Sequence, residues 1–363
     1  MLLSIFGTQS TLSISYARIV EIIAKNTLGE TVSVHAAGID QLREAWSAMP
    51  ASARQAVVLY SDGPQPSLTK LLVDTGAAIA VCIDDFAGVV GFQMINTGKD
   101  FVASVRMSTL TFTAIEPLLR TRNLLTITAS RYDARIEEIV LELTDFYNIR
   151  IDADQLQAIL DRLGHGAGRD ASLRDFIAAE FPEWRPVETA LSTLAASDRK
   201  LVENLAQQYS AIGAGRAFEE VYWPRSFFQY GDVPDRPLDG SIILTGPARI
   251  VFFGPYLHVP PGAWNAEVQI EVTDCRMDTI AYADIFNGEV VLSAVSMRFP
   301  RKGVYAFDIP FATSNPHRPI EIRMHLLKGA IEGELLLHGA RITRTLSNVS
   351  PAAARISMTS ATG

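Results

Sequence analysis

Two adjacent carboxylates and one histidine stand where short apolar strands are predicted to end. Asp84 and Asp85 follow the apolar run of residues 78–83, and His35 ends the run of residues 31–35. In open α/β sheets the carboxyl ends of the strands form the usual ligand edge, so paired acids there can bind a metal or act as acid and base. A histidine at the same edge can act as a general base. We favour the simpler interpretation, in which the acids cap the following helix and the histidine is structural or exposed.

Other catalytic and metal-binding motifs are missing from the sequence. It has no Walker loop, no dinucleotide-binding glycine motif, no HExxH, no zinc-spaced Cys/His cluster and no nucleophile elbow. We therefore expect no cofactor and no metal. Cys82 and Cys275 lie far apart in apolar or strand-like stretches, which predicts two buried free thiols and a reducing compartment.

Composition restricts the class of protein. The 363 residues suit two or three domains, and 48% hydrophobic with 20% charged residues is a globular balance. The net charge is −8 and no Lys/Arg-rich run occurs, so nucleic acid is not expected as a partner. No run of about 18 apolar residues exists, so we expect no membrane span. The chain start lacks a basic segment before its short apolar run, which predicts a cytoplasmic protein.

Residues 1–150 alternate short apolar strands with helical periods. The strands are apolar on both faces, as in a parallel sheet covered by helices on both sides, so we predict a doubly wound α/β domain. The predicted strands are residues 2–6, 31–35, 56–60, 78–83 and 124–129; the predicted helices are residues 15–25, 40–47, 67–75, 101–120 and 134–147.

The rest of the chain divides into three predicted parts. Residues 151–237 read as a helical extension, with a flexible break at 164–168, followed by a proline-rich linker. Residues 238–345 change to a period of two with frequent turns, which predicts an antiparallel β-sandwich of jelly-roll type. Residues 346–363 are rich in Ser, Ala and Thr and are predicted to be a loose tail.

One segment resembles a phosphate-binding element of sulfotransferases. The stretch of residues 80–94 has the spacing of the strand, turn and helix that hold the 3′-phosphate of the sulfate donor in that family. The family places an Arg after the strand and a Ser further along the helix, where this chain has Asp84 and Gly91. A carboxylate repels a phosphate, and a glycine has no hydroxyl to donate.

The turn after the first strand corresponds to the family's phosphate loop. It contains no basic residue, although its glycine and hydroxyl side chains are Gly7, Thr8, Ser10 and Thr11. Residues 124–133 and the two helical stretches after them resemble the closing part of the sulfotransferase domain. The resemblance therefore implies a P-loop sulfotransferase type of fold over residues 1–163 with a degenerate phosphate site, and we expect no binding of 3′-phosphoadenosine donors.

The sandwich resembles jelly-roll carbohydrate-binding modules. In residues 254–264 a Pro-Gly turn precedes an aromatic strand, and residues 335–343 are similar to the last strands of such modules. Trp264 alternates in phase with buried positions and is predicted to be core. Tyr256 and His258 are the better candidates for exposure. The resemblance implies a ligand site in which rings stack on sugars and polar groups bond hydroxyls; its candidate residues are Tyr256, His258, Asp284 and Asn287.

Three functions remain open. The missing basic residues favour a noncatalytic protein that binds a glycan or polysaccharide. The first alternative is a sulfotransferase-like transferase acting on a polysaccharide or glycolipid, with His35, Asp84 and Asp85 as its catalytic candidates. The second alternative is a structural or assembly module whose sandwich binds a protein partner.

Overall fold

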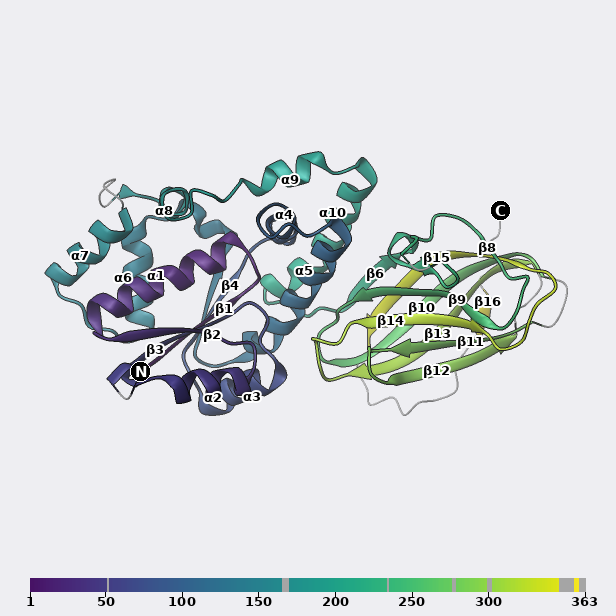
Figure 1. The fold of residues 1–363 in the computed structure, drawn as a ribbon, viewed down its shortest axis with the longest axis horizontal. Coiled ribbons are helices and arrows are strands. Elements are labelled where there is room, and N and C mark those ends of the chain that lie inside the picture. The colour runs from purple at the N-terminus through teal and green to yellow at the C-terminus, as the bar shows by residue number, and fades with distance from the viewer. Residues whose placement is uncertain are drawn as a thin grey trace. The chain divides into compact units, whose positions relative to one another are not determined.

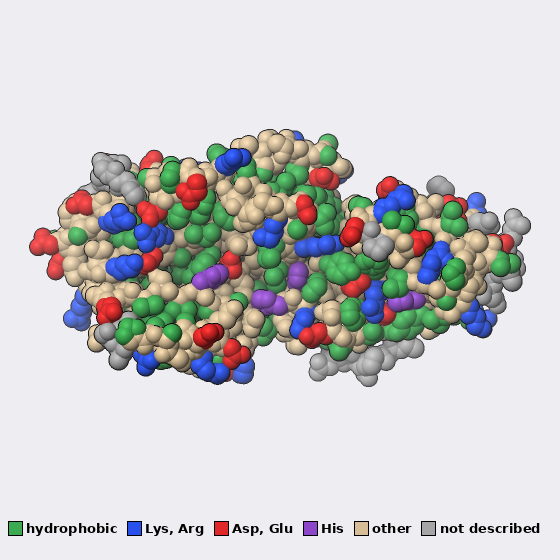
Figure 2. Space-filling model, in the orientation of Figure 1, with side chains coloured by type: hydrophobic (Ala, Val, Ile, Leu, Met, Phe, Trp, Pro, Cys, Tyr) green, Lys and Arg blue, Asp and Glu red, His purple; other side chains and the backbone are tan. Residues whose placement is uncertain are grey.

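The computed structural model divides the chain into two compact units, Met1–Arg216 and Ala217–Gly363. No helix in the described part is long and apolar enough to cross a membrane. On the face drawn in Figure 2, acidic and basic side chains are interspersed. Residues 165–168 of the predicted flexible break lie outside the described residues, which are 1–50, 52–164, 170–233, 235–275, 279–298, 302–345 and 356–358.

A five-stranded parallel sheet forms the centre of the first unit, in the order β2-β3-β1-β4-β5. Each strand pairs in parallel with its neighbours, which confirms the doubly wound α/β prediction. The strands are β1 (Leu2–Gly7), β2 (Thr31–His35), β3 (Ala56–Ser61), β4 (Ile79–Ile83) and β5 (Leu124–Thr128).

Helices cover both faces of this sheet. Figure 1 shows α1, α6 and α7 on one side of it and α2 and α3 on the other. The predicted helical extension belongs to the same unit, because α7 packs on α1 and both α9 and α10 pack on α4. The helices are α1 (Thr11–Thr27), α2 (Ile39–Ala48), α3 (Pro66–Thr75), α4 (Phe86–Asn96), α5 (Phe101–Ile115), α6 (Ile136–Phe146), α7 (Ala153–Gly164), α8 (Leu173–Glu180), α9 (Val187–Thr193) and α10 (Ala196–Gly213).

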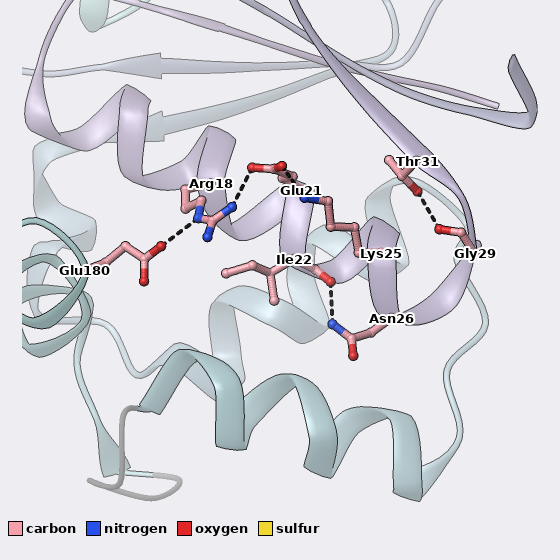
Figure 3. A network of polar contacts seen from close by, with 8 residues as sticks. All are labelled: Arg18, Glu21, Ile22, Lys25, Asn26, Gly29, Thr31 and Glu180. Atoms are coloured by element: carbon pink, nitrogen blue, oxygen red, sulfur yellow. Dashed lines mark hydrogen bonds and ion pairs between the residues drawn. The ribbon is translucent and has the colours of Figure 1, made fainter. Parts of the chain in front are cut away.

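Helix α1 connects the loop at the sheet edge to the outer helices. Ser10 is its N-cap, and its apolar side chains are buried on the sheet. On the other side Arg18 donates to Glu21 at 2.8 Å and to Glu180 of α8 at 2.7 Å (Figure 3). A charge-assisted contact between elements so distant in sequence fixes α8 against α1.

The second unit is a β-sandwich of two antiparallel sheets. Its strands cross repeatedly from one sheet to the other, as a jelly-roll type of sandwich requires. One sheet has the order β16-β13-β10-β15-β6, with β8 also paired to β15, and the other has the order β12-β11-β14-β9-β7. The strands are β6 (Glu220–Pro224), β7 (Gln229–Tyr230), β8 (Ile242–Ile243), β9 (Arg249–Leu257), β10 (Gly262–Asp274), β11 (Ile280–Phe286), β12 (Val291–Arg298), β13 (Gly303–Thr313), β14 (Ile320–Leu326), β15 (Glu334–Arg344) and β16 (Ile356–Met358).

The sandwich is larger than predicted at both of its ends. Residues 220–230 were predicted to lie in the linker, but β6 pairs with β15 and β7 pairs with β9. The linker prediction is wrong there because Val221 and Trp223 alternate with exposed neighbours and are fully buried. In the predicted loose tail, β16 pairs with β13, and the other tail residues lie outside the described ones.

Alternation along the strands builds the sandwich core, as predicted. Trp264 is 1% exposed and its indole nitrogen donates to the Pro260 carbonyl at 3.0 Å, which confirms it as a core residue. Both cysteines are buried free thiols, as expected.

Candidate functional site

The loop after β1 is closed by contacts with β4. A side chain at Gly7 would meet the Cys82 carbonyl oxygen at 2.5 Å, so only glycine fits this close approach. The Thr8 amide donates to the same carbonyl at 3.0 Å, and the Thr8 hydroxyl accepts from the Asp84 amide at 3.1 Å. Thr11 is the first residue of α1. The predicted phosphate loop is therefore a tight connection stabilised by the chain's own groups.

Asp84 places a carboxyl group beside this loop. Its Oδ2 accepts from the Tyr132 hydroxyl at 2.6 Å, and its Oδ1 accepts from the Asp85 amide at 3.0 Å. Burial raises the pKa of Asp84 to about 6, the charge of Asp85 adds to the rise, and hydrogen bonds from Tyr132 and Ser10 oppose it. The position nearest to the N-terminus of α1 is thus taken by an acidic group of the protein itself.

Structural roles also explain the catalytic candidate Asp85 and Gly91 of the predicted phosphate site. Asp85 is exposed and caps α4 by accepting from the Gly88 amide at 2.7 Å, which confirms the capping interpretation. A side chain at Gly91 would meet the Val187 carbonyl oxygen at 2.9 Å, because α9 packs closely on α4 at this point. Gly91 is therefore required for helix packing.

His35 lies at the same edge of the sheet, at the end of β2. Its Nε2 is 3.6 Å from Oδ1 of Asp62, which follows the adjacent β3, and its ring stacks on Tyr60. The hydrogen bond with Asp62 raises the pKa of His35, whose side chain is 63% exposed. Within the described residues no hydrogen bond or ion pair joins His35 to Asp84 or Asp85, so the three catalytic candidates do not form one cluster. The same residues include no group of three or more side chains suited to hold a metal.

The sandwich carries a second polar cluster, on the side of β11 and β14 that faces away from the core. Three cross-strand pairs face each other there, and we call them the β11–β14 outer face. The pairs are Tyr282 with His325, Asp284 with Arg323, and Phe286 with Glu321. The residues between them, such as Ala283, Ile322 and Met324, are fully buried in the sandwich core.

An ion cluster lies at the centre of this face. Asp284 is only 2% exposed and accepts two hydrogen bonds from Arg323, at 2.8 and 3.1 Å. His325 Nε2 lies 3.2 Å from Oδ2 of the same carboxylate. Burial alone would raise the pKa of Asp284, but the hydrogen bonds from His325 and Arg323 outweigh it and hold the pKa below its usual range.

Aromatic rings border the ion cluster on both sides. The Arg323 guanidinium lies 4.0 Å from the centre of the Phe286 ring, and the Tyr282 and His325 rings are 5.6 Å apart. Tyr256 donates its hydroxyl to Glu321 Oε1 at 3.1 Å. The rings of Tyr282, Phe286 and Tyr256 are each partly exposed. Flat apolar surfaces next to oriented hydrogen-bonding groups suit a ligand with the same mixture, such as a sugar.

The four predicted ligand residues have different positions. Tyr256 and Asp284 contribute to the β11–β14 outer face. His258 is buried, contrary to the exposure expected for it. Asn287 stabilises the turn before β12, because its Oδ1 accepts from the amides of Glu289 and Val290 at 3.1 and 2.9 Å.

Sequence reasoning missed the three polar residues of β14 as site residues. Glu321, Arg323 and His325 are visible in the sequence as the polar half of an alternating strand. Their importance comes from the register that brings β14 beside β11. In the first unit it missed Tyr132 and Asp62 as site residues, although the position of each after a strand was a usable signal.

No family model matches the chain, and no curated protein matches it. Similar solved structures include a mouse sulfotransferase complexed with PAP, at 10% identity, covering 59% of this chain and 86% of that chain with a TM-score of 0.40. They also include the C-terminal CBM6 of a marine laminarinase from Zobellia galactanivorans, at 16% identity, 34% and 99% coverage and a TM-score of 0.24. A carbohydrate-binding module CBM36 in complex with calcium and xylotriose matches at 14% identity, 35% and 98% coverage and a TM-score of 0.19. The strand order and pairing of this chain itself define its class, α/β followed by an antiparallel β-sandwich.

Proposed function

We propose that this protein is a noncatalytic binding protein that recognises a glycan on the β11–β14 outer face. The observation that carries the proposal is the buried carboxylate of Asp284, which lies with partly exposed Arg323 and His325 between partly exposed rings. Carboxylate, guanidinium and imidazole groups offer both acceptors and donors to sugar hydroxyls, and the rings offer stacking surfaces.

A purely structural role explains this cluster less well. Replacing a buried ion pair with apolar residues of similar volume is often neutral or stabilising, so stability alone gives little reason to keep one. Side chains on the outer face of a sheet can also remain solvated, so the fold itself does not require these charges to lie together. A buried carboxylate held by two hydrogen bonds from Arg323 beside partly exposed rings is instead the arrangement of a preorganised binding surface.

The first unit supports a role without donor chemistry. Asp84 would repel a phosphate at the loop after β1, and residues 7–12 contain no cation to offset that repulsion. A helix N-terminus attracts anions, but here the nearby carboxyl group is the chain's own. The unit then serves as a scaffold that carries the binding sandwich.

A transferase remains the second candidate, favoured by His35 and Asp62 at the sheet edge. An aspartate that orients an exposed imidazole is the arrangement of a general base, which a transferase would use to activate an acceptor hydroxyl. If His35 is catalytic, the full chain binds an activated donor, and His35→Ala leaves donor binding intact while abolishing transfer.

Affinity electrophoresis of the full chain in gels containing polysaccharides tests the main proposal. We expect retardation by at least one polysaccharide, and Tyr282→Ala should weaken binding about two- to tenfold, the effect of losing one stacking ring. The matched control is Tyr222→Ala, which removes a partly exposed ring from β6 in the other sheet and should bind as the natural protein does. If no polysaccharide binds, the sandwich is instead a module for a protein partner.

A further inference from the structure

Glu321 is a buried carboxylate with too few partners. It is 7% exposed, and within the described part of the chain it accepts one hydrogen bond, from Tyr256, and takes part in no ion pair. An ionised carboxylate offers about four acceptor positions, and buried charges are ordinarily paired. Its second oxygen is therefore available to a donor from outside the chain.

The positive charge beside Glu321 is engaged elsewhere. Arg323 donates two hydrogen bonds to Asp284 and lies over the Phe286 ring. Among the described residues, no cation of the chain forms an ion pair with Glu321. Burial raises the pKa of Glu321, the hydrogen bond from Tyr256 and the charge of Arg323 oppose the rise, and the neighbouring Asp284 adds to it.

Tyr256 adds a second observation at the same place. Its φ of 64° lies in the left-handed region, which is unfavourable for a residue with a large side chain. Strained residues of this kind cluster at ligand sites. Because its hydroxyl is bonded to Glu321, a ligand group that reaches Glu321 also lies beside the tyrosine, whose ring face attracts cations.

We propose that Glu321 receives an ammonium group, and therefore that the glycan is built from amino sugars with free amines. This inference rests on the proposed function, because it takes the β11–β14 outer face as a glycan site. A ligand hydroxyl would supply a hydrogen bond and leave the buried charge uncompensated. An ammonium group supplies three donors together with the missing charge. A uronate or sulfated sugar would bring another negative charge to Glu321.

Isothermal titration calorimetry of the full chain at near-neutral pH tests the inference. The probes are a β-1,4-linked glucosamine tetramer, its fully N-acetylated counterpart and a galacturonic acid tetramer. We expect the free-amine tetramer to bind about tenfold more tightly than the N-acetylated one, the effect of one charge-assisted hydrogen bond. Glu321→Gln removes the charge-assisted hydrogen bond, so the affinities for the free-amine and the N-acetylated tetramers should then differ by no more than about threefold. The control Glu267→Gln, on β10 of the other sheet, should keep the preference.

The outcomes separate the two proposals. If the N-acetylated or acidic tetramer binds as tightly as the free-amine tetramer, the ammonium inference is wrong and glycan binding stands. If neither these tetramers nor a broad panel of polysaccharides binds, glycan binding itself is wrong. If Glu321→Gln does not fold, as judged by loss of cooperative melting, the comparison of the tetramers on the natural chain still decides the inference.

Discussion

Replacing Asp84 with asparagine should change the pH dependence of stability in the first unit. Burial raises the pKa of this carboxyl from 3.8 to about 6. A group whose pKa is higher in the folded state contributes stability that is complete below the unfolded pKa and is lost as the pH rises through the folded one. A tenfold change in the proton equilibrium is worth about 1.4 kcal/mol, so by pH 8 the ionised carboxylate should cost roughly 3 kcal/mol relative to pH 3.

The assay is urea unfolding of the natural chain and Asp84→Asn from pH 3 to pH 8. Two units can unfold in separate steps, so the relevant transition is the one that the substitution moves. Asp84→Asn can also remove hydrogen bonds, but the free energy lost in this way is the same at every pH. It therefore cancels when the effect of the substitution at pH 8 is compared with its effect at pH 3. From pH 3 to pH 8, the free energy of unfolding of the variant should rise by roughly 3 kcal/mol relative to that of the natural chain.

The neighbouring Asp85→Asn is the matched control. Asp85 is exposed, and asparagine is an equally good helix N-cap, so this variant should keep most of the pH dependence of the natural chain. The dependence should be smaller only by the part of the Asp84 pKa rise that the Asp85 charge causes. If the difference between Asp84→Asn and the natural chain is constant with pH, or if the natural chain gains relative stability as the pH rises, the carboxyl is not desolvated as described.

Three further predictions concern packing and donor binding. Trp264→Ala should lower the free energy of unfolding of the sandwich by about 3–5 kcal/mol in urea titrations, and a near-normal midpoint would contradict its core position. Gly91→Ala should destabilise the first unit by about 1–3 kcal/mol, because the new methyl group meets the Val187 carbonyl at 2.9 Å; unchanged melting would show that α9 adapts freely. Calorimetric titration with 3′-phosphoadenosine donors should give no binding, since Asp84 repels phosphate, and micromolar affinity would refute the scaffold role.

The regular parts of the fold were predictable because their signals are local. Apolar runs buried on both faces indicated the parallel strands, and the period of two indicated the sandwich. Strand β6 escaped prediction because its signal is short and is interrupted by Pro224. Its partner is β15, more than a hundred residues later, and only that pairing shows that Trp223 is core.

The candidate sites were predictable only in part, because side-chain partners depend on register. Asp284 and Tyr256 could be selected as polar and aromatic residues near turns. That Asp284 faces Arg323, and that Tyr256 bonds to Glu321, follows from the way β11 and β9 pair with β14. A shift of one residue would have placed the same charges in the core. Alternation along each strand therefore determines which of its side chains face the core, but it does not determine which strand lies beside it.

Two of the buried carboxyl groups, Asp84 and Glu321, differ in how many hydrogen bonds the described residues donate to them. Asp84 already accepts hydrogen bonds from the Tyr132 hydroxyl and the Asp85 amide, so a ligand at that edge would have to break contacts that the chain makes to itself. Among the described residues Glu321 accepts one hydrogen bond, from the Tyr256 hydroxyl, so a ligand there can add a donor. A charged donor at Glu321 would therefore form a charge-assisted hydrogen bond without breaking a contact that the chain makes to itself. This difference supports the proposal that the sandwich recognises the ligand and that the carboxyl edge of the parallel sheet belongs to the scaffold.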